Sequence, residues 1–551
     1  MLIPMKFVFT FLAIVITLFS QAQYFQKQEV FTGDFLEPYD FNIFDNHLFY
    51  TGVDENSTFA NRLYFTNGSI GNIAVQEDGE GNRFDIYEVL GEHLGALYFY
   101  GNTLENPYEL YKITYAGDTP LQITNFNNPD LFGTLSLRSM REIDNNILFD
   151  YDEVIGENRG KELWITDGTP EGTEFFLDIN PNGDGFGYWV GELDNILYFC
   201  ADNGVDGLEL WRTDGTIAGT HMVKDINPSG DGFIGAGVVY DNRLFFVARN
   251  NEQGQEVWTT DGTEAGTQIF TDLNAGSGDG LGYNPQFTVL NGRLYFLAND
   301  GQSGSELWST EGTVEGTELV ADISAGSASS LILNITPFEG RLYFAYRQQG
   351  TSDQRHLWLS DGTEAGTLQV NPSAYIDLPR DMFQVDNELV FLMNNSEGNR
   401  ELWRTDGTDE GTYEIFPEGL ENQWQILGDG HFELFGGRLF VDAALNGDAD
   451  LWSYGAGSIS SISDYINAPS NLLIFPNPSA DVVFFDISFP QSETVNIQIF
   501  DALGREVFCQ NKVCQNQFSI SKESIGTGFF TARITCSNTH EIINQGRFVM
   551  Q

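Results

Sequence analysis

The 551-residue chain predicts an all-β protein: a β-propeller of about eight to nine four-stranded units, followed by a small C-terminal β-sandwich. Three observations support this fold class. The 59 glycines and the 14% aromatic content suit short strands joined by tight turns. A twelve-residue phrase recurs every 45 to 50 residues, and the composition changes near residue 470. We therefore expect a signal peptide at residues 1–22, a propeller at 23–466 and a separate domain at 467–551.

The N-terminus has the features of a signal peptide. Lys6 precedes the apolar run 7–19, and Ser20-Gln21-Ala22 supplies small residues for a signal peptidase. An uncleaved membrane anchor is the alternative, but thirteen apolar residues are short for crossing a bilayer. The expected product is exported, has no transmembrane segment in its mature chain, and is extracellular or on the outer-membrane surface.

The repeated phrase reads ELWRTDGTIAGT in the copy that begins at Glu209. Six strong copies begin at Glu162, Glu209, Glu256, Glu306, His356 and Glu401. Degenerate copies around Tyr64, Tyr111 and Trp452 extend the series to nine units between about residues 27 and 466. Self-similarity at such a period is typical of repeat architectures.

One unit, residues 285–323, contains four extended runs separated by turns. Asn291-Gly292 and Glu311-Gly312 are two-residue hairpin signals. The second run is apolar almost throughout, as in a strand covered on both faces. Four antiparallel strands repeated in this way predict propeller blades. Whether the ring closes is left open; residues 28–31 could supply the outer strand of the last blade.

Alternation along the third strand predicts a structural role for the phrase. Glu209 and Trp211 should share one face, with Leu210 on the other, so that both faces can pack on neighbouring blades. Asp214-Gly215 supplies a turn carboxylate and a residue that tolerates positive φ. A catalytic centre usually occurs once per domain, whereas this phrase recurs, so packing is favoured over chemistry.

The phrase resembles the ELWxxDGT-repeat family of bacterial surface and secreted proteins. The strong copies depart from the family pattern at Val257, Glu311 and His356. The resemblance covers about four-fifths of the chain and implies a repeat-built β architecture without established catalytic residues.

The C-terminal segment differs in charge and pattern. Residues 471–551 carry a net charge of -2, from five Lys/Arg and seven Asp/Glu, and contain short alternating strands. Phe475-Pro476-Asn477-Pro478, the run 501–507 and Gly528-Phe529-Phe530 resemble the type A C-terminal sorting domain of the type IX secretion system of Bacteroidota. The resemblance implies that residues 471–551 engage that secretion machinery; an ordinary adhesive β-sandwich is the alternative.

The formal net charge of -53 excludes nucleic acid as a favoured partner, because binding phosphates depends on Lys and Arg. Excess carboxylate favours solubility and capture of divalent cations.

Calcium is the one cofactor that the sequence suggests. In a four-stranded blade, the loop between the second and third strands and the loop leaving the fourth strand open on one face. Asp/Asn/Gly loops there offer oxygen ligands. The candidate ligands are Asp178, Asn180, Asn182, Asp184, Asp225, Asn227, Asp231, Asp272, Asn274 and Asp279. The first loop begins like an EF-hand but has Trp189 at the twelfth position, so turn formation without metal is slightly favoured.

No catalytic residue is predicted, since the six histidines are scattered singly. Cys200 is expected to be a core thiol, while the disulfide state of Cys509, Cys514 and Cys536 is left open. Trp189 and Trp424 could stack on sugars or pack in the core. The favoured function is a binding module for a glycan or a surface protein; the alternatives are an extracellular polysaccharide hydrolase or lyase and a structural surface-layer component.

Overall fold

The structure is a computed structural model that describes part of the chain. It describes residues 25–27, 39–44, 47–53, 61–66, 85–102, 109–115, 118–126, 140–153, 159–232, 234–282, 284–350, 355–370, 377–395, 397, 399–417, 419–420, 424–426, 432–435, 438–445, 448–455, 473–475, 482–486, 494–501, 506–513, 517–521, 528–536 and 542–550. Every regular element among these residues is a β-strand, as the sequence predicts. None of them lies in a helix long and apolar enough to cross a membrane. The signal-peptide prediction for residues 1–22 and the candidate strand at 28–31 lie outside the described residues.

Nine antiparallel sheets between residues 25 and 455 form the blades of a propeller among the described residues. The first three blades contain β2 (Tyr39–Phe44), β3 (His47–Val53) and β4 (Asn61–Thr66); β5 (Asp85–His93), β6 (Ala96–Asn102), β7 (Glu109–Ile113) and β8 (Leu121–Gln122); and β9 (Arg141–Ile143), β10 (Asn146–Glu153), β11 (Gly160–Thr166) and β12 (Glu174–Leu177). The next three contain β13 (Phe186–Leu193), β14 (Ile196–Asp202), β15 (Leu208–Thr213) and β16 (His221–Lys224); β17 (Gly237–Tyr240), β18 (Arg243–Asn250), β19 (Gly254–Thr260) and β20 (Gln268–Thr271); and β21 (Thr288–Leu290), β22 (Arg293–Asn299), β23 (Ser305–Thr310) and β24 (Glu318–Ala321). The last three contain β25 (Leu333–Phe338), β26 (Arg341–Tyr346), β27 (His356–Ser360) and β28 (Leu368–Gln369); β29 (Asp377–Val385), β30 (Glu388–Asn394), β31 (Arg400–Thr405) and β32 (Tyr413–Ile415); and β33 (Trp424–Ile426), β34 (Phe432–Phe435), β35 (Arg438–Leu445) and β36 (Asp448–Tyr454). The blade number is therefore nine, the upper of the two predicted values.

The N-terminal strand closes the ring. Strand β1 (Phe25–Lys27) pairs antiparallel with β36, placing Phe25 opposite Tyr454 and Lys27 opposite Trp452. Strand β2 of the first blade also contacts β34 of the last blade. Closure by the N-terminus agrees with the prediction, although the strand that performs it lies just before residues 28–31.

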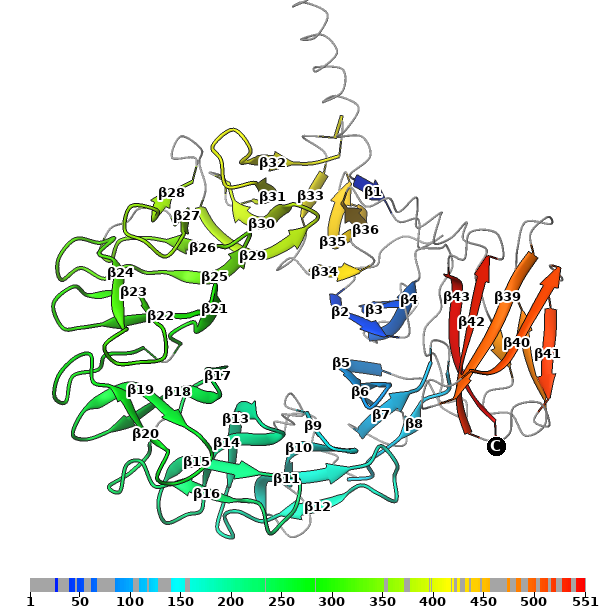
Figure 1. Cartoon of the computed structure of the whole chain (residues 1–551), viewed down its shortest axis with the longest axis horizontal. Helices are drawn as coiled ribbons and strands as arrows, with labels where there is room; N and C mark the ends of the chain where they lie inside the picture. The colour runs from blue at the N-terminus through cyan, green and yellow to red at the C-terminus, as the bar shows by residue number, and fades with distance from the viewer. Residues whose placement is uncertain are drawn as a thin grey trace, which may run out of the picture. The chain divides into compact units, whose positions relative to one another are not determined.

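The core is divided among the joints between blades. Each hydrophobic cluster found among the described residues combines side chains of two consecutive blades: Leu210 of β15, for example, packs with Phe246 of β18. In the first eight blades the first strand lies at the inner edge of the ring, and in the ninth β34 lies there (Figure 1). A blade therefore buries both of its faces only when both neighbours are present, which is the expected energetics of a repeat array.

The C-terminal unit contains two antiparallel sheets. One has the order β37 (Leu473–Phe475), β38 (Val482–Asp486) and β41 (Gln517–Ser521); the other has the order β40 (Glu506–Val513), β39 (Thr494–Asp501), β42 (Gly528–Cys536) and β43 (Ile542–Met550). Cys509 lies on β40 and Cys536 on β42, while Cys514 lies outside the described residues.

Candidate functional site

The aspartate of the repeated phrase forms its own turn. Asp214 Oδ1 accepts from the backbone N (3.0 Å) and the Oγ1 (2.6 Å) of Thr216, and Thr213 and Thr220 join their hydroxyls at 2.7 Å. The Thr216 hydroxyl and amide lower the pKa of the Asp214 carboxyl. Equivalent contacts are made by Asp167, Asp261, Asp361 and Asp406. The predicted structural role of the phrase agrees with these contacts.

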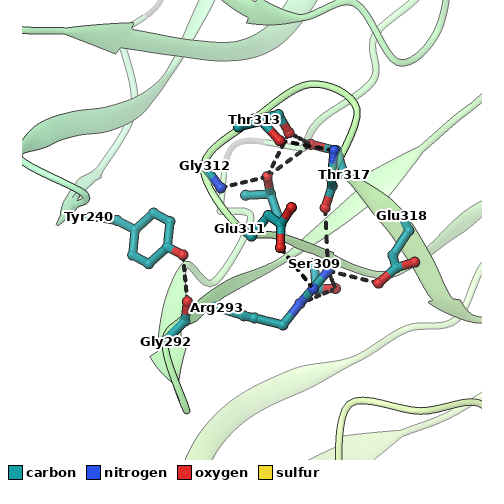
Figure 2. A network of polar contacts seen from close by, with 11 residues as sticks. Tyr240, Gly292, Arg293, Ser309, Glu311, Gly312, Thr313, Thr317 and Glu318 are labelled. Atoms are coloured by element: carbon teal, nitrogen blue, oxygen red, sulfur yellow. Dashed lines mark hydrogen bonds and ion pairs between the residues drawn. The ribbon is translucent and has the colours of Figure 1, made fainter.

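Glu311 replaces aspartate in one copy, and its longer side chain behaves differently (Figure 2). Its Oε2 lies 4.0 Å from Nη1 of Arg293, whose Nη2 donates to Ser309 Oγ at 3.0 Å and to Glu318 Oε1 at 2.8 Å. The loop keeps its shape through Thr313, whose Oγ1 accepts from Gly316 N at 3.1 Å. The departure from the phrase thus adds an ion pair with Arg293 and leaves the turn in place.

The glutamate of the phrase holds the loop that leaves the fourth strand. Glu209 is fully buried, and its two oxygens accept from the backbone N of Ile226 (2.7 Å) and Asn227 (3.2 Å). Burial raises the pKa of the Glu209 carboxyl to about 7, and the two amides oppose that shift. Glu162, Glu256 and Glu306 are buried in the same way, with pKa values also raised to about 7.

A glycine of the phrase allows close contact between blades. Gly262 has φ +88°, and a Cβ there would lie 2.4 Å from the Oη of Tyr198 in the preceding blade. From the same blade, Arg212 Nη1 donates to the carbonyl of Gly262 at 3.2 Å. Gly362 and Gly407 meet Tyr295 and Tyr343 in the same way. Only glycine satisfies both the backbone angle and this approach.

The predicted calcium ligands lie where two loops meet on one face. Asp184 Oδ1 accepts from Lys161 N at the start of β11, and Asp231 Oδ1 accepts from Leu208 N at the start of β15, both at 3.0 Å. Asp279 Oδ1 accepts from Gln255 N in the next blade, also at 3.0 Å. The loops between second and third strands therefore meet the loops leaving the fourth strands, as expected from the blade topology.

Most of these candidate ligands make turn contacts. The Nδ2 atoms of Asn180, Asn227 and Asn274 donate to the carbonyls of Asp184, Asp231 and Asp279 at 3.2, 2.8 and 3.1 Å. Asn182 N donates to Asn180 Oδ1 at 3.1 Å, and Asp272 Oδ2 accepts from Gly276 N at 3.5 Å. Among the described residues, the Oδ1 atoms of Asp178 and Asp225 are buried without a hydrogen-bond partner. No three His, Cys, Asp or Glu side chains in the described part of the chain are grouped to hold a metal. Calcium binding here stays a prediction.

The other singled-out side chains belong to the core. Cys200 is fully buried and free, which confirms the predicted core thiol. Burial raises the pKa of this thiol to about 12. Trp189 packs against Phe199, their ring centroids 5.6 Å apart, and Trp424 packs against Trp452 at 6.2 Å. These two tryptophans therefore have core partners.

A cavity of about 520 Å³ opens between the β5–β8 blade and the β9–β12 blade. We call this boundary the open joint. The described residues that line the cavity are Gln122, Ile123, Thr124, Asn125, Phe126, Trp164, Pro170 and Thr173. Phe126 and Trp164 are half-buried, with ring centroids 4.9 Å apart, and Phe126 stacks on Tyr151 at 3.8 Å.

The loop that borders this cavity is anchored differently from the loops of the strong copies. The Thr124 hydroxyl donates to the Glu109 carboxylate at 2.6 Å. The same hydroxyl oxygen accepts from Leu110 N at 2.8 Å. In four strong copies, backbone amides 17 and 18 positions after the glutamate donate to its carboxylate, as Ile226 and Asn227 donate to Glu209, whereas Thr124 lies 15 positions after Glu109.

Sequence reasoning did not find this cavity, because its walls come from two units. The position opposite the phrase tryptophan gave no signal. It holds Phe175, Met222, Ile269 or Leu319 in four strong copies and Gln369 or Glu414 in the other two, so Gln122 opposite Tyr111 does not mark the weaker unit by itself.

Comparisons with known proteins identify the C-terminal segment. Residues 473–545 match the family described as a secretion system C-terminal sorting domain. This confirms the predicted resemblance to a sorting domain, implies a link to the type IX secretion machinery, and indicates export with attachment to the cell surface or secretion. No curated protein sequence matches the chain.

Solved structures similar to the chain include a prolyl endopeptidase, with 10% identity and a TM-score of 0.36, covering 79% of this chain and 56% of that one. A puromycin-hydrolyzing peptidase from Mycobacterium tuberculosis has 9% identity, a TM-score of 0.34 and coverage of 74% and 57%. The β-propeller domain of the Trilobed protease from Pyrococcus furiosus has 10% identity, a TM-score of 0.30 and coverage of 69% and 98%. The chain spans a little over half the length of the two peptidases. Similarity at this level carries no information on activity.

Proposed function

We propose that this protein is an exported β-propeller that binds a glycan or another surface protein outside the cell. The sorting domain at residues 473–545 is the observation that carries the extracellular role. A ring of blades is a suitable binding scaffold, because loops of different sequence project from a rigid core.

The repeated polar side chains support binding through parts that differ between blades. Asp214 and Glu209 are engaged within their own blade and the loop that leaves it, and Gly262 contacts the neighbouring blade. Groups already satisfied in this way are poorly placed to recognise a ligand. Recognition is therefore assigned to blade-specific loops and joints.

The proposed organisation keeps the predicted boundaries: a signal peptide at 1–22, the propeller at 23–466 and the sorting domain at 467–551. The last described propeller strand ends at Tyr454, and the next begins at Leu473. We assign the two C-terminal sheets to a β-sandwich, the common arrangement for two antiparallel sheets with alternating side chains.

Export is tested by deleting residues 471–551 in the native host. The truncated protein should fold and accumulate in the periplasm, because a separate domain can be removed without disturbing the ring. Cell fractionation measures its location, with the full chain as control. Truncated protein outside the cell would contradict the role of the tail.

Binding is tested with the purified full chain on a glycan array, a panel of extracellular polysaccharides and intact cells. Saturable binding without new reducing ends or unsaturated products supports the binding module. Product formation would instead favour a hydrolase or lyase. Self-association without any ligand would favour a surface-layer component.

A further inference from the structure

We propose that the cavity at the open joint binds a sugar ring of a neutral glycan. This inference rests on the proposed extracellular binding role and names the place and chemical class of the ligand. The volume of about 520 Å³ lies within the range of about 300–1,000 Å³ that is typical of small-molecule sites.

The lining combines an apolar wall with neutral polar groups. Phe126 and Trp164 supply aromatic surface, and their half-buried rings leave part of that surface exposed. The negative face of an aromatic ring attracts weakly positive C–H groups, which a sugar ring presents on its flat faces. Asn125 adds an amide and Thr173 a hydroxyl suited to sugar hydroxyls, whereas the Gln122 amide already donates to Thr124 O at 2.7 Å.

The described part of this lining consists of uncharged residues, which favours a neutral sugar. The chain has 79 Asp and Glu and 26 Lys and Arg, yet none of the described lining residues is charged. A phosphate, a uronic acid or a basic peptide would find no described counter-charge there. A neutral, hydroxyl-rich ligand with an apolar face fits the wall as it is.

Asn125 is a suitable recognition residue. Its side chain is exposed, and no described residue forms a hydrogen bond with its amide. The amide can therefore donate to and accept from adjacent sugar hydroxyls without breaking a contact within the protein. Thr173 is less adaptable, because its hydroxyl already donates to Thr169 O at 2.7 Å and pairs with Thr166 Oγ1 at 2.6 Å.

Pro170 provides a way to close the cavity without touching the core. It is exposed on the loop after β11, where other copies of the phrase carry Ile217, Glu264, Val314, Glu364 and Asp409. This position tolerates side chains of different size and charge, so Pro170→Trp should fold. Ile217→Trp places the same bulk at the equivalent position of the next blade, where Ile217 is 62% exposed.

The experiment measures affinity by isothermal titration calorimetry with the full chain. The probes are neutral oligomers of glucose, mannose, galactose and N-acetylglucosamine, with oligogalacturonate as the anionic comparison. We expect at least one neutral oligomer to bind. Asn125→Ala should weaken it by roughly three- to tenfold, the loss of about one or two hydrogen bonds. Pro170→Trp should weaken it by more than about tenfold through steric exclusion. Ile217→Trp should bind like the unmodified chain, and melting temperatures should confirm that all variants fold.

Several results would overturn the proposal. If a neutral glycan binds but both Asn125→Ala and Pro170→Trp retain full affinity, the site lies elsewhere, while the general binding function survives. Preference for oligogalacturonate, or cavity-dependent binding of a protein ligand instead of any sugar, would refute the neutral-glycan class. Failure of every neutral oligomer to bind would also refute it; binding of the same chain to intact cells would then show that the wider proposed function still holds.

Discussion

The open joint and the joint between the β13–β16 and β17–β20 blades use the same strand arrangement with different results. In the latter, which we call the closed joint, Ile226 and Trp258 are 4% and 5% exposed and share one hydrophobic cluster. In the open joint, Phe126 and Trp164 occupy the equivalent positions of their units but are half-buried beside a cavity. The loop anchored by Glu209 thus borders a packed core, and the loop anchored by Glu109 borders a cavity.

Replacing the phrase tryptophan should have the largest effect and should separate the two joints. Trp258→Ala should lower the free energy of unfolding by about 3–5 kcal/mol, because it leaves a void in a closed core. Trp164→Ala should cost less, because its ring already adjoins a cavity. Guanidinium chloride denaturation of the full chain measures both. Equal losses would show that the open joint is packed as tightly as the closed one.

Removing the loop anchor should have the next largest effect. Glu209→Ala leaves the amides of Ile226 and Asn227 without their acceptor, which should cost about 2–4 kcal/mol. At the open joint, Thr124→Val removes the hydroxyl between Glu109 and Leu110 and should cost about 1–2 kcal/mol. The same denaturation experiment applies. A larger decrease in the free energy of unfolding for Thr124→Val than for Glu209→Ala would contradict this ranking of the two anchors.

The closed joint should also respond to pH. Burial raises the pKa of Glu209 to about 7 in the folded chain, so the folded state holds a proton that the unfolded state has released above about pH 4.5. The stabilisation from this proton is fully present below the pKa of Glu209 in the unfolded state. It is lost as pH rises through the pKa of Glu209 in the folded state. The melting temperature should therefore be higher at about pH 5 than at about pH 8. Glu209→Gln should flatten part of that slope; an unchanged slope would show that other groups cause it.

Calcium should have the smallest effect, confined to the loops that leave β12, β16 and β20. Asp178, Asp225 and Asp272 lie 16 positions after the phrase glutamate, where the open-joint loop has Asn125. If calcium binds, Asp178→Ala and Asp225→Ala should lower the melting temperature only when calcium is present, because a ligand stabilises the state that binds it. The control is the same melt with chelator. Identical curves for the unmodified chain under both conditions would leave these residues as turn formers.

The sequence by itself determined the parts of this protein that depend on short, repeated patterns. The period of the phrase, the alternation around Trp211 and the turn residues Asp214-Gly215 were sufficient for an all-β propeller with up to nine blades. The same alignment of units identified Cys200 as a core thiol. These inferences hold because side-chain alternation and turn chemistry act over a few residues and recur in each unit.

The tertiary structure decided what depends on residues from different units. It placed Phe25–Lys27 against β36, buried Glu209 so that its pKa rises, and brought Trp164 to within 4.9 Å of Phe126. The N-terminal closure and the contact between Trp164 and Phe126 depend on residues from different units, and the burial of Glu209 depends on how the loop that leaves its own blade folds back over it. Packing at a joint is set by volume, burial and hydrogen bonding together, and a single polar side chain such as Thr124 can shift that balance without altering the repeat pattern.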